Sequence, residues 1–160
     1  MRLALSAIVL AAVAAATAVA QPIPKSSRVG CDLSIGARDE PSPDARIVAD
    51  RIALPRARYP HMLARTRSPV FRFSAKWGAE LRGGTGQRVT VSVARPWRRH
   101  AKIGWGNGTA TSVTFLPCTS RSPWIAYAGG FELRKRGCVP FDVRVAGRTR
   151  RIRIGFGRSC

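Results

Sequence analysis

Side chains that commonly carry out catalysis are few in this chain of 160 residues. The two histidines, His61 and His100, stand in turn-like segments, and no serine has the surroundings of a nucleophile elbow. A glycosidase needs a pair of carboxylates, but five of the eight acidic residues precede residue 51, and the others are Glu80, Glu132 and Asp142. We therefore predict no catalytic residue, no metal and no cofactor, and we expect a protein that is not an enzyme.

Aromatic and cationic side chains gather in one segment. Trp97, Arg98, Arg99 and His100 are consecutive, and Trp105 follows close behind in a glycine-rich stretch. Exposed aromatic rings interleaved with arginine can stack on bases or sugar rings, so these five residues form our candidate binding site. The competing interpretation places all four tryptophans of the chain in the core of a small domain.

The same segment, Trp97–Gly108, carries an alternative function, that of a small secreted hydrolase or an enzyme inhibitor. A hydrolase there requires His100 or His61 within hydrogen-bond reach of an acid. The glycine runs at 83–86 and 104–108 invite comparison with phosphate-binding loops. Neither continues into Gly-Lys-Ser/Thr or lies between a strand and a helix, so we interpret both as turns between strands.

Four cysteines, Cys31, Cys118, Cys138 and Cys160, predict two disulfides in an oxidising compartment. A zinc site needs closely spaced ligands, and the cysteines are 87, 20 and 22 residues apart with no histidine nearby. Three pairings are open. The one we favour joins Cys118 to Cys138 and Cys31 to Cys160, because the second bond would fasten both ends of the chain.

Charge is unevenly distributed. The chain has 28 Lys and Arg against 8 Asp and Glu, a net charge of +20, and residues 51–160 hold 23 of the bases but three of the acids. Such a surface attracts polyanions at low salt. We expect anionic cell-envelope polymers or other polyanions as partners, and no specific nucleic acid. The alternative is that the arginines reflect a GC-rich genome and have no role.

The first 20 residues have the features of a secretory signal peptide. Arg2 precedes an uncharged stretch rich in Ala, Val and Leu, which ends in the small residues that a signal peptidase recognises, Ala18-Val19-Ala20. The alternative is an uncleaved membrane anchor, which the many alanines and the prolines at 22 and 24 disfavour. We predict cleavage before Gln21, a secreted, extracytoplasmic protein, and no further transmembrane span.

The rest of the chain divides into an irregular N-terminal arm, residues 21–46, and a single β domain, residues 47–160. Short runs of alternating apolar and polar residues recur in the domain between turn signals. The clearest is Arg88–Ala94, in which three valines face one way while Arg, Thr and Ser face the other. About eight such strands predict an all-β fold, an antiparallel β-sandwich or barrel with two disulfides.

Particular strands can be placed from their flanking turns. Ile47–Leu54 is expected to be the first strand of the domain, ending at a proline. Trp124–Tyr127 and Phe131–Arg134 flank two glycines and resemble a hairpin. Residues 57–67 could at best form a short helix.

The last strands have the most readable pattern. Apolar residues alternate with polar ones on both sides of Ala146-Gly147, which predicts a hairpin turning at these two residues. Its register places Phe141 opposite Ile152 on the core face and Asp142 opposite Arg151 on the solvent face, an opposite-charge pair.

Several short motifs stand out within residues 69–160. They are Leu116-Pro117-Cys118, the segment Trp124–Phe131 with the sequence WIAYAGGF, Cys138-Val139-Pro140, and Gly155–Cys160 with the sequence GFGRSC. With these motifs the chain resembles a group of uncharacterised small secreted proteins of high-GC Gram-positive bacteria. The resemblance implies a secreted domain with paired cysteines and transfers no catalytic residue. We therefore expect a non-enzymatic extracytoplasmic binding or structural module, retained on anionic envelope polymers.

Overall fold

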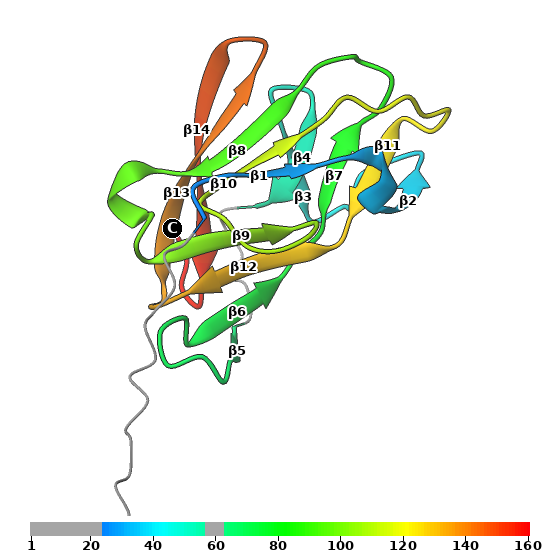
Figure 1. The fold of residues 1–160 in the computed structure, drawn as a ribbon. Coiled ribbons are helices and arrows are strands. Elements are labelled where there is room, and N and C mark those ends of the chain that lie inside the picture. Colours follow the sequence, from blue (N-terminus) through cyan, green and yellow to red (C-terminus); the bar gives the residue numbers. More distant parts are fainter. Residues whose placement is uncertain (1–23, 57–62) are drawn as a thin grey trace, which may run out of the picture.

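The computed structural model describes residues 24–56 and 63–160, and this part of the chain folds mainly into β-strands (Figure 1). Helical structure there amounts to two 3-10 turns, η1 (Cys31–Leu33) and η2 (Arg95–Trp97). The prediction of an all-β protein with two disulfides is confirmed. No helix in the described residues is long and apolar enough to cross a membrane. The predicted signal peptide and most of the suggested helix lie outside the described residues.

The described strands form three sheets, in which all neighbours are antiparallel apart from β1 and β10. Sheet A has the order β1 (Ser27–Val29), β10 (Ser112–Phe115), β8 (Val89–Val93), β13 (Gly137–Val145) and β14 (Arg148–Phe156). Sheet B has the order β2 (Ser34–Arg38), β11 (Trp124–Tyr127), β7 (Ala79–Arg82), β4 (Ile52–Pro55) and β3 (Ala45–Val48). Sheet C has the order β5 (Ala64–Arg65), β6 (Phe73–Lys76), β12 (Gly129–Leu133) and β9 (Ala101–Trp105).

One core joins the three sheets. Phe131 of sheet C contacts Phe141 and Phe156 of sheet A, with ring centroids 5.3 and 5.0 Å apart. Phe115 of sheet A contacts Tyr127 of sheet B at 5.1 Å. The inner face of sheet A therefore packs on both other sheets, and the alternation along its strands places the polar residues between the core residues on the opposite, outer face.

The described residues contain fourteen strands instead of about eight, because one predicted strand is divided and the short strands β1, β2, β5 and β7 were not predicted. Ile47–Leu54 is not one strand. It spans the β3–β4 hairpin, in which Ala49 and Asp50 adopt positive φ angles of 51° and 53°. Asp50 is a common turn residue but Ala49 is not, so the apolar run on either side hid the bend.

The expected hairpin around Gly129-Gly130 is wrong. β11 and β12 do not pair with each other but follow one another along β7 and β6 (Figure 1). The register is the same in both halves, because Tyr127 lies opposite Ala79 and Gly130 opposite Lys76. Residues 73–82 and 124–133 thus form one long ribbon that passes from sheet C into sheet B.

Two consecutive glycines permit this crossing. Gly129 has a φ of +150°, and a Cβ there would collide with the carbonyl oxygen of Gly104 in β9. A Cβ on Gly130 would collide with the carbonyl oxygen of Ala75 in β6. The glycines are therefore required by close approach of neighbouring backbones in the interior of a sheet.

The C-terminal hairpin has the predicted register. Phe141 lies opposite Ile152, and Asp142 lies opposite Arg151. The Arg151 guanidinium donates hydrogen bonds of 2.7 and 3.1 Å to the two carboxylate oxygens of Asp142. The turn at Ala146-Gly147 has φ angles of 46° and 77°, as a two-residue hairpin loop requires.

Residues 21–46 do not form an irregular arm where the structure describes them. They contain β1, β2 and the start of β3. β1 is bonded to sheet A, where the Leu116 N–H donates to the Val29 carbonyl at 2.9 Å. β2 is exposed along its whole length. An edge strand with no buried face has no hydrophobic alternation, so this part of the sequence carried no strand signal.

The favoured disulfide pairing is also wrong. The bonds join Cys31 to Cys118 and Cys138 to Cys160. β1 runs parallel to β10, with Val29 opposite Phe115. The segments that follow the two strands therefore leave the sheet side by side and bring Cys31 beside Cys118. Cys138 lies opposite Gly155 at the open end of the C-terminal hairpin, and the last residues turn back to it.

Candidate functional site

Trp105 does not belong to a surface site. It is fully buried, its rings contact Phe115 and Phe131, and its Nε1–H donates a 2.8 Å hydrogen bond to the Trp77 carbonyl. The neighbouring glycines suggested a loop, but Gly104 lies within β9, where the strand passes close to Gly108 and Gly130. The structure therefore removes Trp105 from the predicted binding residues.

The other four predicted binding residues stay together at the η2 turn. Trp97 and His100 are half-buried and contact each other with ring centroids 5.9 Å apart. Arg98 and Arg99 are exposed. The Arg98 Nε–H donates to the Val93 carbonyl at 3.1 Å, which holds this side chain at the end of β8.

His100 has cationic surroundings. Partial burial lowers its pKa below the usual 6.5, and the nearby charges of Lys135, Arg99 and Arg134 lower it further. The Arg99 Nε–H donates to Nε2 of the imidazole at 3.2 Å. No acid of the described chain forms an ion pair with His100, so the geometry that a hydrolase needs is not formed there. His61 lies outside the described residues.

The three acids that follow residue 51 each have a basic partner, which for Glu80 is Arg38 at 3.6 Å. Asp142 pairs with Arg151, as described above. Glu132 in β12 lies 3.5 Å from the Lys102 Nζ. Glu80 in β7 is buried, and its carboxylate accepts 2.7 Å hydrogen bonds from both the N–H and the hydroxyl of Ser42. Each carboxylate therefore has a structural role in its own sheet.

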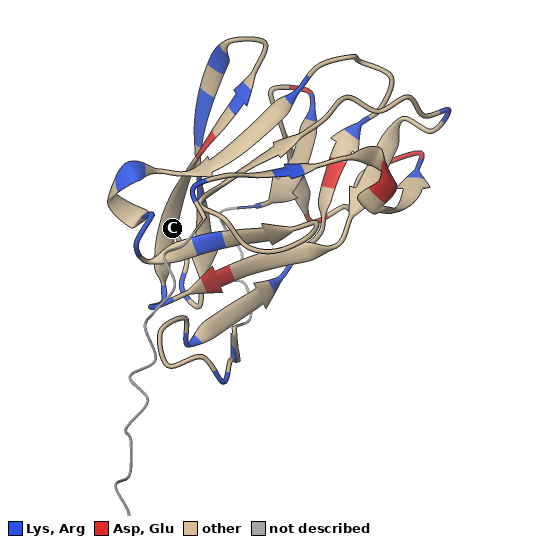
Figure 2. Ribbon diagram, in the orientation of Figure 1, with Lys and Arg blue, Asp and Glu red and all other residues tan. Residues whose placement is uncertain are grey.

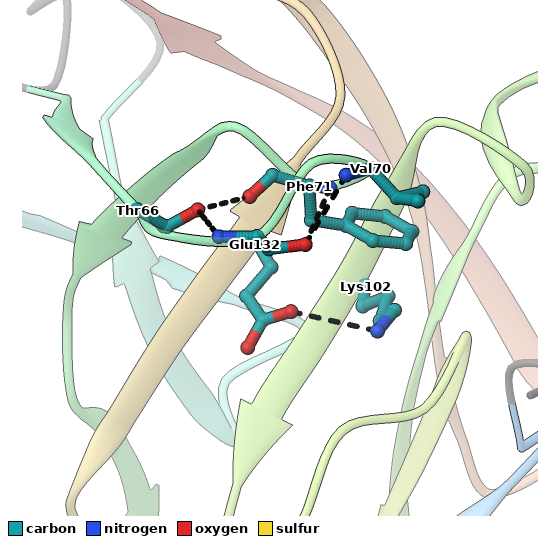
Figure 3. Close-up of polar contacts among 6 residues, drawn as sticks. Thr66, Val70, Phe71, Lys102 and Glu132 are labelled. Carbon is teal, nitrogen blue, oxygen red and sulfur yellow. Dashed lines mark hydrogen bonds and ion pairs between the residues drawn. The ribbon is translucent and has the colours of Figure 1, made fainter. Parts of the chain in front are cut away.

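The side chains around Glu132 contact one another and the nearby backbone (Figure 3). Lys102 lies under the ring of Phe71, with its Nζ 4.0 Å from the ring centroid. The loop that carries Phe71 is closed by hydroxyls: Thr66 Oγ1 bonds to the Phe71 carbonyl, and Ser68 Oγ accepts from the Phe71 N–H at 3.0 Å. These hydroxyls are committed to the backbone, which is typical of Ser and Thr in tight loops.

The outer face of sheet A holds a different kind of site. Two pairs of small hydroxyl residues cross from β8 to β10: Thr90 and Thr114 with hydroxyls 3.0 Å apart, and Ser92 and Ser112 at 2.7 Å. We call these four residues the hydroxyl ladder. Because their side chains are short and satisfy one another, they form a shallow polar floor along both strands.

An arginine-lined cleft opens at one end of the ladder. It has a volume of about 560 Å³ and is lined by Arg28, Arg88 and Arg144 around Thr90 and Thr114, with Gly86, Gln87, Leu116, Ala146 and Gly147 completing it. We call it the arginine cleft. Arg28, Thr114, Thr90 and Arg144 occupy one cross-strand row from β1 to β13. The lining contains no acid, and the described structure gives these three arginines no ion pair.

A second basic cleft opens at the other end of the ladder. It is lined by Lys25, Arg98 and Arg99 beside Ser92, Ser112 and Thr111, with a volume of about 420 Å³ and no acid. We call it the lysine–arginine cleft. Thr111 donates its hydroxyl to the Lys25 carbonyl at 3.1 Å, which fixes the start of the described chain against β10.

The distribution of charge agrees with these clefts (Figure 2). Basic residues lie on β1, around η2 and on the β13–β14 hairpin, where β13 also carries one acid, and sheets B and C carry basic residues together with acids on β7 and β12. A third cleft beside the hairpin tip is lined by Arg51, Arg148 and Arg150, but it includes Asp50. Asp50 pairs with Arg82 at 3.0 Å and with Arg51 at 3.5 Å, so that cleft is partly neutralised.

Sequence reasoning placed Arg88 on the polar side of its strand but missed the arginine cleft. Arg28 was assigned to the irregular arm, and Arg144 was one of several arginines in the last hairpin. They meet because β1, β8 and β13 belong to one sheet, and strand order is not visible in a single sequence. Comparison with protein-family models, with curated proteins and with solved structures gives no match to this chain.

Proposed function

We propose that this protein is a secreted, non-enzymatic binding module that holds an anionic polymer of the cell envelope in the arginine cleft. The observation that carries the proposal is the convergence of Arg28, Arg88 and Arg144 on one cleft that has no acid. Three cations with no counter-charge repel one another, and a bound anion removes that repulsion.

The side chains suit phosphate or carboxylate groups. A guanidinium presents a planar fork of donors that matches two oxygens of one anion, and it stays charged at any physiological pH. The hydroxyls of Thr90 and Thr114 lie between Arg28 and Arg144 and supply further polar groups at the floor. The cleft therefore offers hydrogen bonds as well as charge.

The compartment is consistent with this partner. The protein has two disulfides, and disulfides form and persist in oxidising compartments. Export by the segment Met1–Ala20 would bring the protein to the envelope, where anionic polymers are abundant. Such a module needs no reaction chemistry, only a surface that remains basic in the presence of salt.

The test uses the full chain, exported by its host, and divides it into envelope-bound and free fractions over a salt series. We expect release from the envelope between about 0.1 and 0.5 M salt, because exposed charges are increasingly screened over this range. The double variant Arg88→Gln/Arg144→Gln should be released at lower salt than the unmodified protein.

The matched control is Arg67→Gln/Arg121→Gln, which removes the same charge from two exposed loop residues outside the basic clefts. It should be released close to the salt concentration of the unmodified protein. Equal release of the two double variants would assign retention to net charge and overturn the role of the cleft. Free protein at every salt concentration would overturn the function itself.

A further inference from the structure

The two basic clefts lie on the same face and on the same two strands. Thr90 and Ser92 alternate with buried valines along β8, and Ser112 and Thr114 alternate with the buried Val113 and Phe115 along β10. The two threonines line the arginine cleft, and the two serines line the lysine–arginine cleft. The hydroxyl ladder is therefore a common floor that continues from one cleft to the other.

We propose that this floor and its two basic ends form one track for a linear polyanion that extends along β8 and β10. This inference rests on the proposed function and gives it a substrate class: a flexible polymer with repeated phosphate groups, bound at two places, instead of a single anion. The polymer would contact Arg28, Arg88 and Arg144 at one end and Lys25, Arg98 and Arg99 at the other.

The length of the track follows from the strand. Arg98 is bonded to the carbonyl of Val93, five residues beyond Arg88. At roughly 3.3 Å per residue, the two ends are about 17 Å apart. A single phosphate or a very short oligomer cannot reach both ends, whereas an extended chain of several repeats can.

The floor also indicates which polymer fits. Thr90, Thr114, Ser92 and Ser112 are small and polar, and neither cleft lining includes an aromatic ring. Proteins that bind single-stranded nucleic acid without sequence preference stack bases on aromatic side chains. A track without them favours a polymer without bases, such as a phosphodiester polymer of the envelope.

One acid lies beside the track and does not block it. Asp142 is the cross-strand neighbour of Ser92, but both of its oxygens are held by Arg151 on the far side of β13. The third cleft, at the hairpin tip, contains Asp50, which pairs with Arg51 and Arg82, so it is less basic than the two clefts that end the track.

The test measures affinity for two probes of the same chemistry, tripolyphosphate and a polyphosphate of tens of units, at several salt concentrations. Binding at two ends raises the local concentration of the second phosphate group, so the long probe should bind at least about 10-fold tighter. The slope of log affinity against log salt should approach about −4 for six cationic groups on an extended chain.

The decisive variant is Arg98→Gln/Arg99→Gln. We expect it to bind tripolyphosphate at the arginine cleft within about 2-fold of the unmodified protein, because that cleft is intact. It should lose most of the advantage of the long probe, and its salt slope should weaken by about 1.4. Lys25→Gln/Arg99→Gln should give the same result while leaving the bond between Arg98 and Val93 in place.

The controls separate the two proposals. A long probe has more ways to bind than a short one, but this statistical factor is equal in all variants, so the ratio of the two affinities is compared. Arg67→Gln/Arg121→Gln should keep that ratio. If both cleft variants keep it too, the track is wrong while the arginine cleft stands.

Two further outcomes would decide the matter differently. If neither probe binds the unmodified protein, the proposed function fails and the track fails with it. If single-stranded DNA with the same number of phosphates binds more tightly than polyphosphate, the inference of a polymer without bases is overturned.

Discussion

Removal of the Cys31–Cys118 disulfide should weaken both the fold and the arginine cleft. The bond lies just beyond the shared end of β1 and β10, and β1 carries Arg28. β1 has three residues and one neighbouring strand, so the disulfide is the covalent attachment that holds this edge. The perturbation is Cys31→Ser/Cys118→Ser. Serine at 118 keeps a hydrogen-bonding atom opposite the Tyr127 hydroxyl, which lies 3.2 Å from the Cys118 sulfur.

The expected cost follows from the loop that each bond closes. Cys31 and Cys118 are 87 residues apart, and Cys138 and Cys160 are 22 apart. In the chain-entropy model, closure of these loops destabilises the unfolded state by about 4.6 and about 3.4 kcal/mol at 25 °C. Loss of the first bond should therefore cost about 1 kcal/mol more than loss of the second.

The assay is urea-induced unfolding of both double serine variants beside the unmodified protein. The dependence of the free energy of unfolding on urea concentration should be equal in all three, so that a shift in midpoint reports a change in stability. The affinity for polyphosphate is measured in parallel. We expect Cys31→Ser/Cys118→Ser to lose affinity by about the factor that Arg28→Gln loses. Cys138→Ser/Cys160→Ser should bind as the unmodified protein does, since no lining residue of the basic clefts adjoins that bond.

Two results would refute this reasoning. If loss of Cys138–Cys160 costs as much as loss of Cys31–Cys118, loop length does not govern the stabilisation. If polyphosphate affinity is unchanged when Cys31–Cys118 is absent, pairing with β10 alone positions β1, and the disulfide has no part in the cleft.

Three other changes have expected outcomes. Ala146→Asn should raise the free energy of unfolding by about 1 kcal/mol, because Ala146 has a φ of 46° and asparagine tolerates this conformation better; an unchanged thermal midpoint would contradict this. Glu80→Ala should cost about 1.5–3 kcal/mol, since it removes a buried carboxylate that accepts two hydrogen bonds from Ser42, whereas Ser42→Ala should cost less in the same unfolding assay. His100 should titrate below 6.5 by NMR, with its signal assigned from His100→Gln. The unfolded chain then binds more protons than the folded one, so the contribution of His100 to stability is complete above pH 6.5 and decreases as the pH falls below it.

Some of the fold could be predicted because independent signals agreed. In the C-terminal hairpin, hydrophobic alternation, a two-residue turn and the Asp142–Arg151 pair all require the same register. β8 was predicted for the same reason, because its valines have a buried face and its polar residues an exposed one. Where one face of a strand is buried, the side-chain period is strongly specified.

Other parts could not be predicted because their determinants lie elsewhere in the chain. β2 has no buried face, so its partner β11 decides its conformation. The Cys31–Cys118 disulfide depends on the parallel pairing of β1 with β10, strands about 85 residues apart. Trp105 was predicted to be a binding residue because it follows the aromatic and cationic segment Trp97–His100, but it belongs to β9 and its ring is buried.

The candidate site could also be predicted only in part, because residues distant in the sequence form it. Arg98 and Arg99 were selected for their neighbours in sequence, and they line a basic cleft, but Trp97 and His100 are not among its lining residues. The arginine cleft takes its three cations from positions 28, 88 and 144. No local pattern links these positions. The sheet places Arg28 and Arg144 in the cross-strand row of Thr90, and Arg88 lies two residues before Thr90.

The ribbon of residues 73–82 and 124–133 restricts how the length of this chain can vary. Because one register runs through sheets B and C, an insertion of a single residue would shift the pairing of both sheets and turn core side chains outward in each. The flanking loops have no strand pairing at residues 85–88 and 119–122, so an insertion there would leave this register unchanged. We therefore expect related chains to differ in length in those loops, close to one mouth of the arginine cleft, while the ribbon keeps its length.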